Sequence, residues 1–73
     1  MSDTLTPGVF NTHTYCKVYA DSALDRAKAL DIQVNAPEAD ADAATKAASA
    51  RVVKNAQETV DALAEVAVKF GIA

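Results

Sequence analysis

Apolar residues recur at steps of three and four through most of the chain, which is the period of an α-helix. The longest such run predicts a helix over about residues 36–70. Charged residues between Arg51 and Lys69 occupy the other positions, so the run predicts an apolar stripe that is covered by protein. The stripe consists of Ala41, Ala48, Val52, Ala56, Thr59, Val60, Leu63, Val66, Ala67 and Phe70.

Both ends of this predicted helix carry residues that are typical of helix termini. Asn35 suits the N-cap, Pro37 is tolerated in the first turn, and Glu38 stands three residues after the cap. Lys69 would lie beside the negative end of the helix dipole, and Gly71 suits the position after the C-cap. The terminal signals therefore agree with the apolar period.

A shorter helical pattern covers about residues 14–31. A capping box is suggested by SALD at 22–25, which leaves a later start open. The pattern stops at DIQVNAP, so we predict that the chain reverses there and forms an all-α, two-helix antiparallel hairpin. The face predicted to pack on the longer helix contains Cys16, Tyr19, Ala20, Ala23, Ala27 and Leu30.

Residues 1–13 show neither a helical nor a strand period. Pro7 and Gly8 favour a turn, while Val9 and Phe10 are apolar and suit anchoring contacts. We predict an extended N-terminal arm at 1–13, followed by a single helical domain at 14–73. A frayed terminus is the alternative.

The chain is too short and too rich in alanine to bury a thick core of its own. It has 73 residues, and small domains bury a poor fraction of their surface. The predicted second helix would be about 52 Å long, against a radius of gyration of roughly 11 Å for a compact chain of this length. The first helix would cover only about half of the stripe, so we expect partner chains to cover the rest.

These partner contacts are predicted on two sides of the second helix. In the segment 38–50, alanine lies on nearly every side of the helix. High helix propensity alone explains this composition, but we favour the alternative that neighbours also touch the back of the helix. The predicted interface consists of Val52, Ala56, Val60, Leu63, Ala67 and Phe70 on the stripe, with Ala47 on the back.

Charge and hydropathy exclude several classes of partner. The formal net charge is −3 and the basic residues form no cluster, whereas nucleic-acid binding depends largely on Lys and Arg. No stretch approaches the ~20 apolar residues of a membrane span, and residues 1–13 lack the features of a cleaved signal peptide. We therefore expect protein partners, no nucleic acid and no membrane, in the cytoplasm or on a virion or other particle.

The candidate chemistry is concentrated in NTHTYCKVY, residues 11–19, which contain the one histidine, the one cysteine and both tyrosines. His13, Tyr15 and Cys16 are possible ligands for a metal or haem. However, Cys16 falls on the predicted packing face, where a free thiol behaves as a small hydrophobe. We favour packing and capping roles and expect no cofactor, while an intermolecular disulfide through Cys16 stays open.

No motif in the chain indicates catalysis. The two glycines stand far apart, which rules out a glycine-rich phosphate loop, and His13 has no scaffold for a nucleophile and base. The hypothesis is a non-catalytic structural or assembly subunit that oligomerises or docks on a larger complex, such as a virion accessory or cement-type protein or a small accessory subunit. The alternative is a small oligomeric metal- or haem-binding protein that uses His13, Tyr15 or Cys16.

Overall fold

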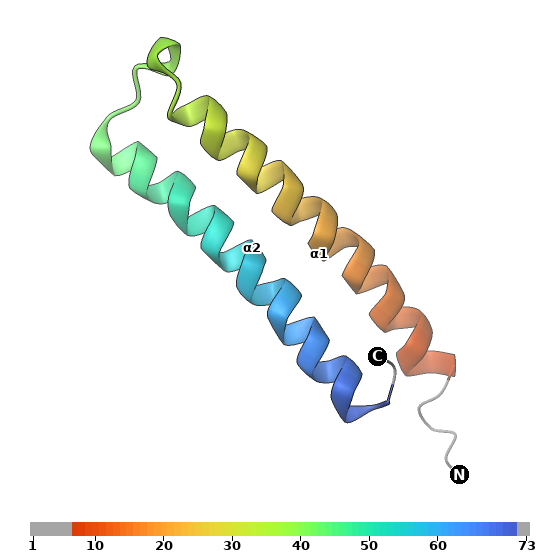
Figure 1. The fold of residues 1–73 in the computed structure, drawn as a ribbon. Helices are drawn as coiled ribbons and strands as arrows, with labels where there is room; N and C mark the ends of the chain where they lie inside the picture. The colour runs from red at the N-terminus through yellow and green to blue at the C-terminus, as the bar shows by residue number, and fades with distance from the viewer. Residues whose placement is uncertain (1–6, 72–73) are drawn as a thin grey trace.

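The chain folds as two long α-helices that lie side by side and run in opposite directions (Figure 1). The structure, a computed structural model, describes residues 7–71. Helix α1 spans Pro7–Val34 and helix α2 spans Ala43–Lys69, with a short 3₁₀ helix, η2, at Pro37–Ala39 between them. The prediction of an all-α antiparallel hairpin is confirmed.

The first helix is longer at both ends than the sequence pattern predicted. It begins at Pro7 rather than near residue 14 and ends at Val34 rather than at 31. The predicted arm is therefore wrong for residues 7–13, which are helical, while residues 1–6 of that arm lie outside the described residues. Proline is well suited to a first helical position, because the N–H that it lacks would have no partner within the helix.

The second helix begins later than predicted. Asp40 has a positive φ of 49° after η2, which interrupts the expected continuous helix from 36. The N-cap is Asp42 rather than Asn35, and the carboxylate of Asp42 accepts a hydrogen bond from the Thr45 backbone N–H at 2.8 Å. The chain reverses direction between Val34 and Ala43. The residue that caps α2 is therefore Asp42, which follows the reversal, and not Asn35, which precedes it.

Asn35 instead closes the end of α1. Its side-chain amide donates to the Asp31 backbone carbonyl at 2.8 Å and to the Asp31 carboxylate at 3.2 Å. Its backbone N–H also donates to the Asp31 carbonyl at 3.0 Å. The residue thus satisfies acceptor groups at the end of one helix, rather than donor groups at the start of the next.

The C-terminal end of α2 follows the prediction. Phe70 is the C-cap, and Gly71 after it has a positive φ of 66°. The Gly71 N–H donates to the Val68 carbonyl at 3.2 Å, which satisfies an acceptor of the last turn. Glycine is favoured here because a side chain disfavours the left-handed conformation, and Lys69 stands in the last turn as expected.

The two helices meet along a seam of residues that alternate at steps of four and three. This spacing repeats every seven residues and is the packing pattern of coiled coils. Alanine occupies four of its positions, which allows the helices to approach closely there. The seam consists of His13, Ala20, Leu24, Ala27, Asp31 and Val34 from α1 and of Ser49, Val53, Ala56, Val60, Leu63 and Ala67 from α2, all buried or half-buried.

The predicted packing face of the first helix is only partly correct. Ala20 and Ala27 are buried in the seam, but the other four residues of that face are exposed: Cys16, Tyr19, Ala23 and Leu30. The helix is rotated relative to the prediction, because Leu24 and the buried His13 occupy the seam on the other side of the alanines. The interpretation of Cys16 as a buried core thiol is therefore wrong for this hairpin.

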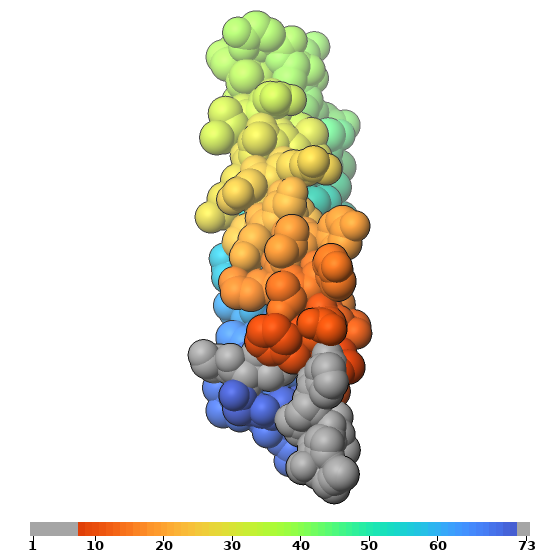
Figure 2. All heavy atoms as spheres, turned by 90° about the vertical axis from the view of Figure 1, so that its right-hand side faces the viewer, coloured from red at the N-terminus to blue at the C-terminus, as the bar shows by residue number. Residues whose placement is uncertain are grey.

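The hairpin is long and narrow, as Figure 2 shows from the side of α1. It measures 57 × 14 × 13 Å, and its radius of gyration of 16.4 Å exceeds the roughly 11 Å of a compact chain of this length. Among the described residues, the buried apolar side chains are those of Ala20, Leu24, Ala27 and Ala67. Together these four residues do not form a thick core, because three of them are alanine.

Candidate interaction surface

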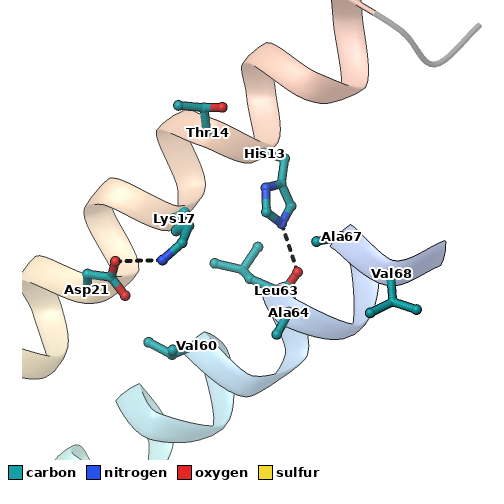
Figure 3. A pocket seen from close by; sticks show the side chains of 9 residues that line it. All are labelled: His13, Thr14, Lys17, Asp21, Val60, Leu63, Ala64, Ala67 and Val68. Carbon is teal, nitrogen blue, oxygen red and sulfur yellow. Dashed lines mark hydrogen bonds and ion pairs between the residues drawn. The ribbon is translucent and has the colours of Figure 1, made fainter. Parts of the chain in front are cut away.

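His13 links the two helices near the open end of the hairpin. The side chain is buried, with 8% of its surface exposed. Its Nε2 lies 2.7 Å from the backbone carbonyl oxygen of Leu63, so Nε2 carries the proton and donates the hydrogen bond (Figure 3). This contact uses Nε2 to join the two helices, and it leaves Nδ1 as the ring nitrogen with a free lone pair.

A hollow of about 390 Å³ lies beside His13 between the two helices. Its walls include Val60, Leu63 and Ala67 of α2, and the ion pair of Lys17 with Asp21 lies on the α1 side (Figure 3). The Lys17 ammonium donates to the Asp21 carboxylate at 3.0 Å, and both side chains are well exposed. The hollow thus combines apolar walls with charges that already satisfy each other.

The three candidate ligands do not converge. Tyr15 stands two residues after His13, about 200° around the helix, and is 68% exposed. Cys16 is exposed on α1 and lines a shallow hollow together with His13, so these two of the three candidates lie on one flank. Within the part of the chain that the structure describes, no three His, Cys, Asp or Glu side chains are close enough to hold one metal ion. A metal or haem site on a single hairpin would therefore have at most two of the proposed ligands.

An uncharged and mainly apolar strip runs beside the seam. Cys16, Ala23 and Leu30 recur at intervals of seven on α1, and Val52, Thr59 and Val66 do so on α2. Such an interval returns to nearly the same face of a helix. With Tyr19 added, these residues form what we call the apolar strip. All seven are exposed and none is charged.

Both halves of the apolar strip lie on the same side of the hairpin. Cys16 of α1 and Val66 of α2 line one shallow hollow between the helices. Tyr19, Arg26 and Leu30 of α1 and Val52 of α2 line a second hollow on the same flank of each helix, so one charged side chain lies beside the strip there. The strip is therefore one continuous surface that spans both helices.

The opposite side of the seam is different in character. Asp21, Lys28 and Gln57 directly follow the seam residues Ala20, Ala27 and Ala56, and all three are exposed. Residues of the apolar strip instead directly precede seam residues, as Tyr19 precedes Ala20. Asp21 and Lys28 thus lie directly beside the seam on one flank, whereas on the other flank the charged residues Arg26 and Glu58 line hollows together with strip residues.

The residues of the predicted interface fall into three environments. Val52 belongs to the apolar strip, Phe70 is a partly exposed C-cap, and Ala47 is exposed on the far side of α2 from the seam. The other four form part of the seam with α1: Ala56, Val60, Leu63 and Ala67. Sequence analysis placed Tyr19, Leu30 and Val66 on inward faces, although the regular intervals of seven indicate a second band beside the seam.

Comparisons with protein-family models, curated proteins and solved structures find no match to this chain. Among the described residues, no helix combines the length and apolar character that crossing a bilayer requires. The geometry of the hairpin is therefore the basis for a functional proposal.

Proposed function

We propose that this protein is a non-catalytic assembly subunit that binds other protein chains through its apolar strip. The observation that carries the proposal is the strip itself, an uncharged surface of exposed residues that extends along both helices. Contact with protein would remove this surface from water, and burial of apolar surface contributes about 25 cal/mol per Å².

The width of the apolar band supports this function. Two helices that pair only with each other need apolar residues at two positions of every seven, whereas helices in a larger bundle carry apolar residues at a third position. In this hairpin the seam supplies the first two positions and the apolar strip supplies the third on both helices. The sequence thus has the pattern of a helix pair that belongs to a larger assembly.

The thin seam supports the same function. It buries mainly alanine, and the polar seam residues Asp31 and Ser49 occupy positions that could otherwise hold apolar side chains. Small chains with such limited burial gain stability from staples such as disulfides, metals or partner chains. The lone Cys16 provides no disulfide within one chain, which favours partner chains as the source of stability.

The proposed subunit works in the cytoplasm or on a particle. Two kinds of subunit fit this proposal: a virion accessory or cement-type protein, and a small accessory subunit of an enzyme complex. Both would dock through the uncharged side chains of the apolar strip, and this docking is what we propose.

The test compares native assembly of the wild-type chain with that of two variants on α2. In extracts of its source cells, the tagged wild-type chain is expected to elute in a complex larger than one hairpin. Val66→Glu places a charge in the apolar strip and should release the chain, because an unpaired charge is costly to bury. Val68→Glu changes another exposed valine, outside the strip, and should leave the complex intact.

Two results would contradict the proposal. One is a wild-type chain that elutes as a single hairpin and melts cooperatively at a temperature that does not depend on its concentration. The other is equal behaviour of Val66→Glu and Val68→Glu in the extract. Circular dichroism of both variants shows whether each retains its helices.

A further inference from the structure

We infer that the hollow beside His13 is a binding site for an uncharged small molecule that has an apolar body and one hydrogen-bond donor. The hollow lies on the Lys17 side of the seam, whereas Cys16 and the rest of the apolar strip lie on the other side. The inference therefore goes beyond the proposed docking function and does not depend on it.

The size and the walls of the hollow fit the body of such a ligand. Its volume is about 390 Å³, which lies within the range of about 300–1,000 Å³ that is typical of ligand pockets. The wall that α2 contributes is entirely apolar and consists of Val60, Leu63, Ala64, Ala67 and Val68. An apolar ligand body would remove these side chains from water, which favours binding.

The ring nitrogen Nδ1 of His13 provides the matching hydrogen-bond acceptor. The side chain is 8% exposed, and its Nε2 donates to the Leu63 carbonyl at 2.7 Å, so Nδ1 carries the lone pair. Figure 3 shows Nδ1 on the edge of the ring that faces Lys17, which lines the same hollow. Among the described residues, no hydrogen bond reaches Nδ1. Since polar groups of buried side chains normally have a partner, a donor on the ligand would complete the site.

The other polar groups of the walls favour an uncharged ligand. The Lys17 ammonium pairs with the Asp21 carboxylate at 3.0 Å, and the Thr14 hydroxyl donates to the Phe10 carbonyl at 2.9 Å. A charged ligand would place its charge beside apolar side chains, with no opposite charge left to pair it. The donor for Nδ1 is therefore a hydroxyl or a neutral N–H group rather than an ammonium group.

The experiment titrates the purified full chain with two probes that differ in one donor. The first is 4-propylphenol, which has an apolar body and a hydroxyl group. The second is 4-propylanisole, in which a methyl group replaces the hydroxyl hydrogen. Calorimetry measures both dissociation constants at pH 8, where free imidazole is mostly neutral. Nitrogen NMR of the one histidine reports whether Nδ1 accepts a hydrogen bond.

The phenol should bind at one site with a dissociation constant below about 1 mM, which a ligand of this size can reach. The ether should bind about 10-fold more weakly, because it lacks one hydrogen bond. The Nδ1 resonance should shift with the phenol and stay nearly unchanged with the ether. Since the ether is the more apolar probe, nonspecific hydrophobic binding would give the opposite order of affinities.

Two alanines of α2 supply matched variants. Ala64 and Ala62 are both exposed, but Ala64 lines this hollow and Ala62 lines a different one. Ala64→Leu should weaken the binding of 4-propylphenol by about 10-fold or more, because the larger side chain occupies space in the hollow. Ala62→Leu should change it by less than about two-fold. Leucine forms helix nearly as well as alanine, so both variants should retain α2.

Any of four results would overturn the inference: no saturable binding of 4-propylphenol, equal affinity for the two probes, an Nδ1 resonance that the phenol does not shift, or equal effects of the two leucine variants. The docking function is tested separately by Val66→Glu, because Val66 belongs to the apolar strip and does not line this hollow.

Discussion

At the scale of single residues, two polar contacts set the alignment of the helices. His13 donates to the Leu63 carbonyl near the open end, and the Ser49 hydroxyl donates to the Asp31 carboxylate at 2.8 Å near the loop. The contacts lie at opposite ends of a seam in which half of the residues between them are alanine. Since alanine side chains have little shape to distinguish one alignment from another, polar contacts of this kind can specify register.

We predict that Ser49 and Asp31 are energetically coupled. The stability of wild type, Ser49→Ala, Asp31→Ala and the double variant, measured by thermal unfolding at one chain concentration, forms a double-mutant cycle. The coupling should be about 1 kcal/mol, the usual net value of a hydrogen bond in a protein. Simple additivity of the two single effects would show that the contact does not help to fix the helix register.

The N-cap of α2 predicts a specific pH dependence. Hydrogen bonds from the Thr45 hydroxyl and from the Thr45 backbone N–H lower the pKa of Asp42 below its ordinary value of 3.8. Because the folded chain holds Asp42 ionised more strongly than the unfolded chain does, ionised Asp42 stabilises the fold above this ordinary value. That contribution is lost as the pH falls through the lowered pKa.

Asp42→Asn isolates this contribution, since asparagine is also a good N-cap but does not titrate. Thermal unfolding of wild type and Asp42→Asn between pH 5 and pH 2 should show a stability difference that shifts against the wild type as the pH falls. A difference that stays constant over this range would mean that Asp42 does not act through its charge.

At the scale of the helices, the seam and the apolar strip place different demands on alanine. Seam alanines such as Ala20 and Ala27 are buried where the helices approach closely. Ala23 lies in the strip and is exposed. The same residue type thus serves two purposes on one helix, which explains why composition alone did not separate the two surfaces.

Ala27→Leu should destabilise the hairpin by about 1–3 kcal/mol, because extra volume in the seam forces the helices apart. Ala29→Leu is the matched control: Ala29 is exposed, and leucine forms helix nearly as well as alanine. Its effect should stay within about 0.5 kcal/mol. Thermal unfolding followed by circular dichroism measures both, and a tolerated Ala27→Leu would contradict close packing at this position.

At the scale of the whole molecule, the hairpin resembles half of a bundle more than a complete domain. Its long, narrow shape leaves the apolar strip without a covering element among the described residues. The side of α2 that points away from α1 is a second candidate surface, because the alanine-rich sequence around Ala47 suggested a contact there. The proposed docking through the strip leaves Ala47 in solvent.

Ala47→Glu tests whether the back is also a contact. Since Ala47 is exposed on the side of α2 away from the seam, the variant should retain both the helicity and the assembled mass of the wild type. Circular dichroism and sedimentation provide the two measurements. A loss of mass with unchanged helicity would establish a second interface on the alanine-rich back, as the sequence pattern suggested.

The sequence by itself determined that the chain is an all-α hairpin, and it located the end of α2 at Gly71. These features depend on local chemistry: the helical period of apolar residues, high helix propensity and the freedom of glycine to adopt a positive φ. The start of α2 was not determined in this way. Asn35 and Asp42 are both suitable caps, and the reversal of the chain decided between them.

Only the tertiary structure decided which part of each apolar band lies between the helices. The bands are wider than the seam, so either side of a band could have packed inward without a change in the helical pattern. Leu24 and the paired polar contacts of His13 and Ser49 select one rotation. That rotation leaves Tyr19 and its neighbours exposed as the apolar strip. The helical pattern alone could not predict which residues are exposed, because this depends on the position of the opposing helix.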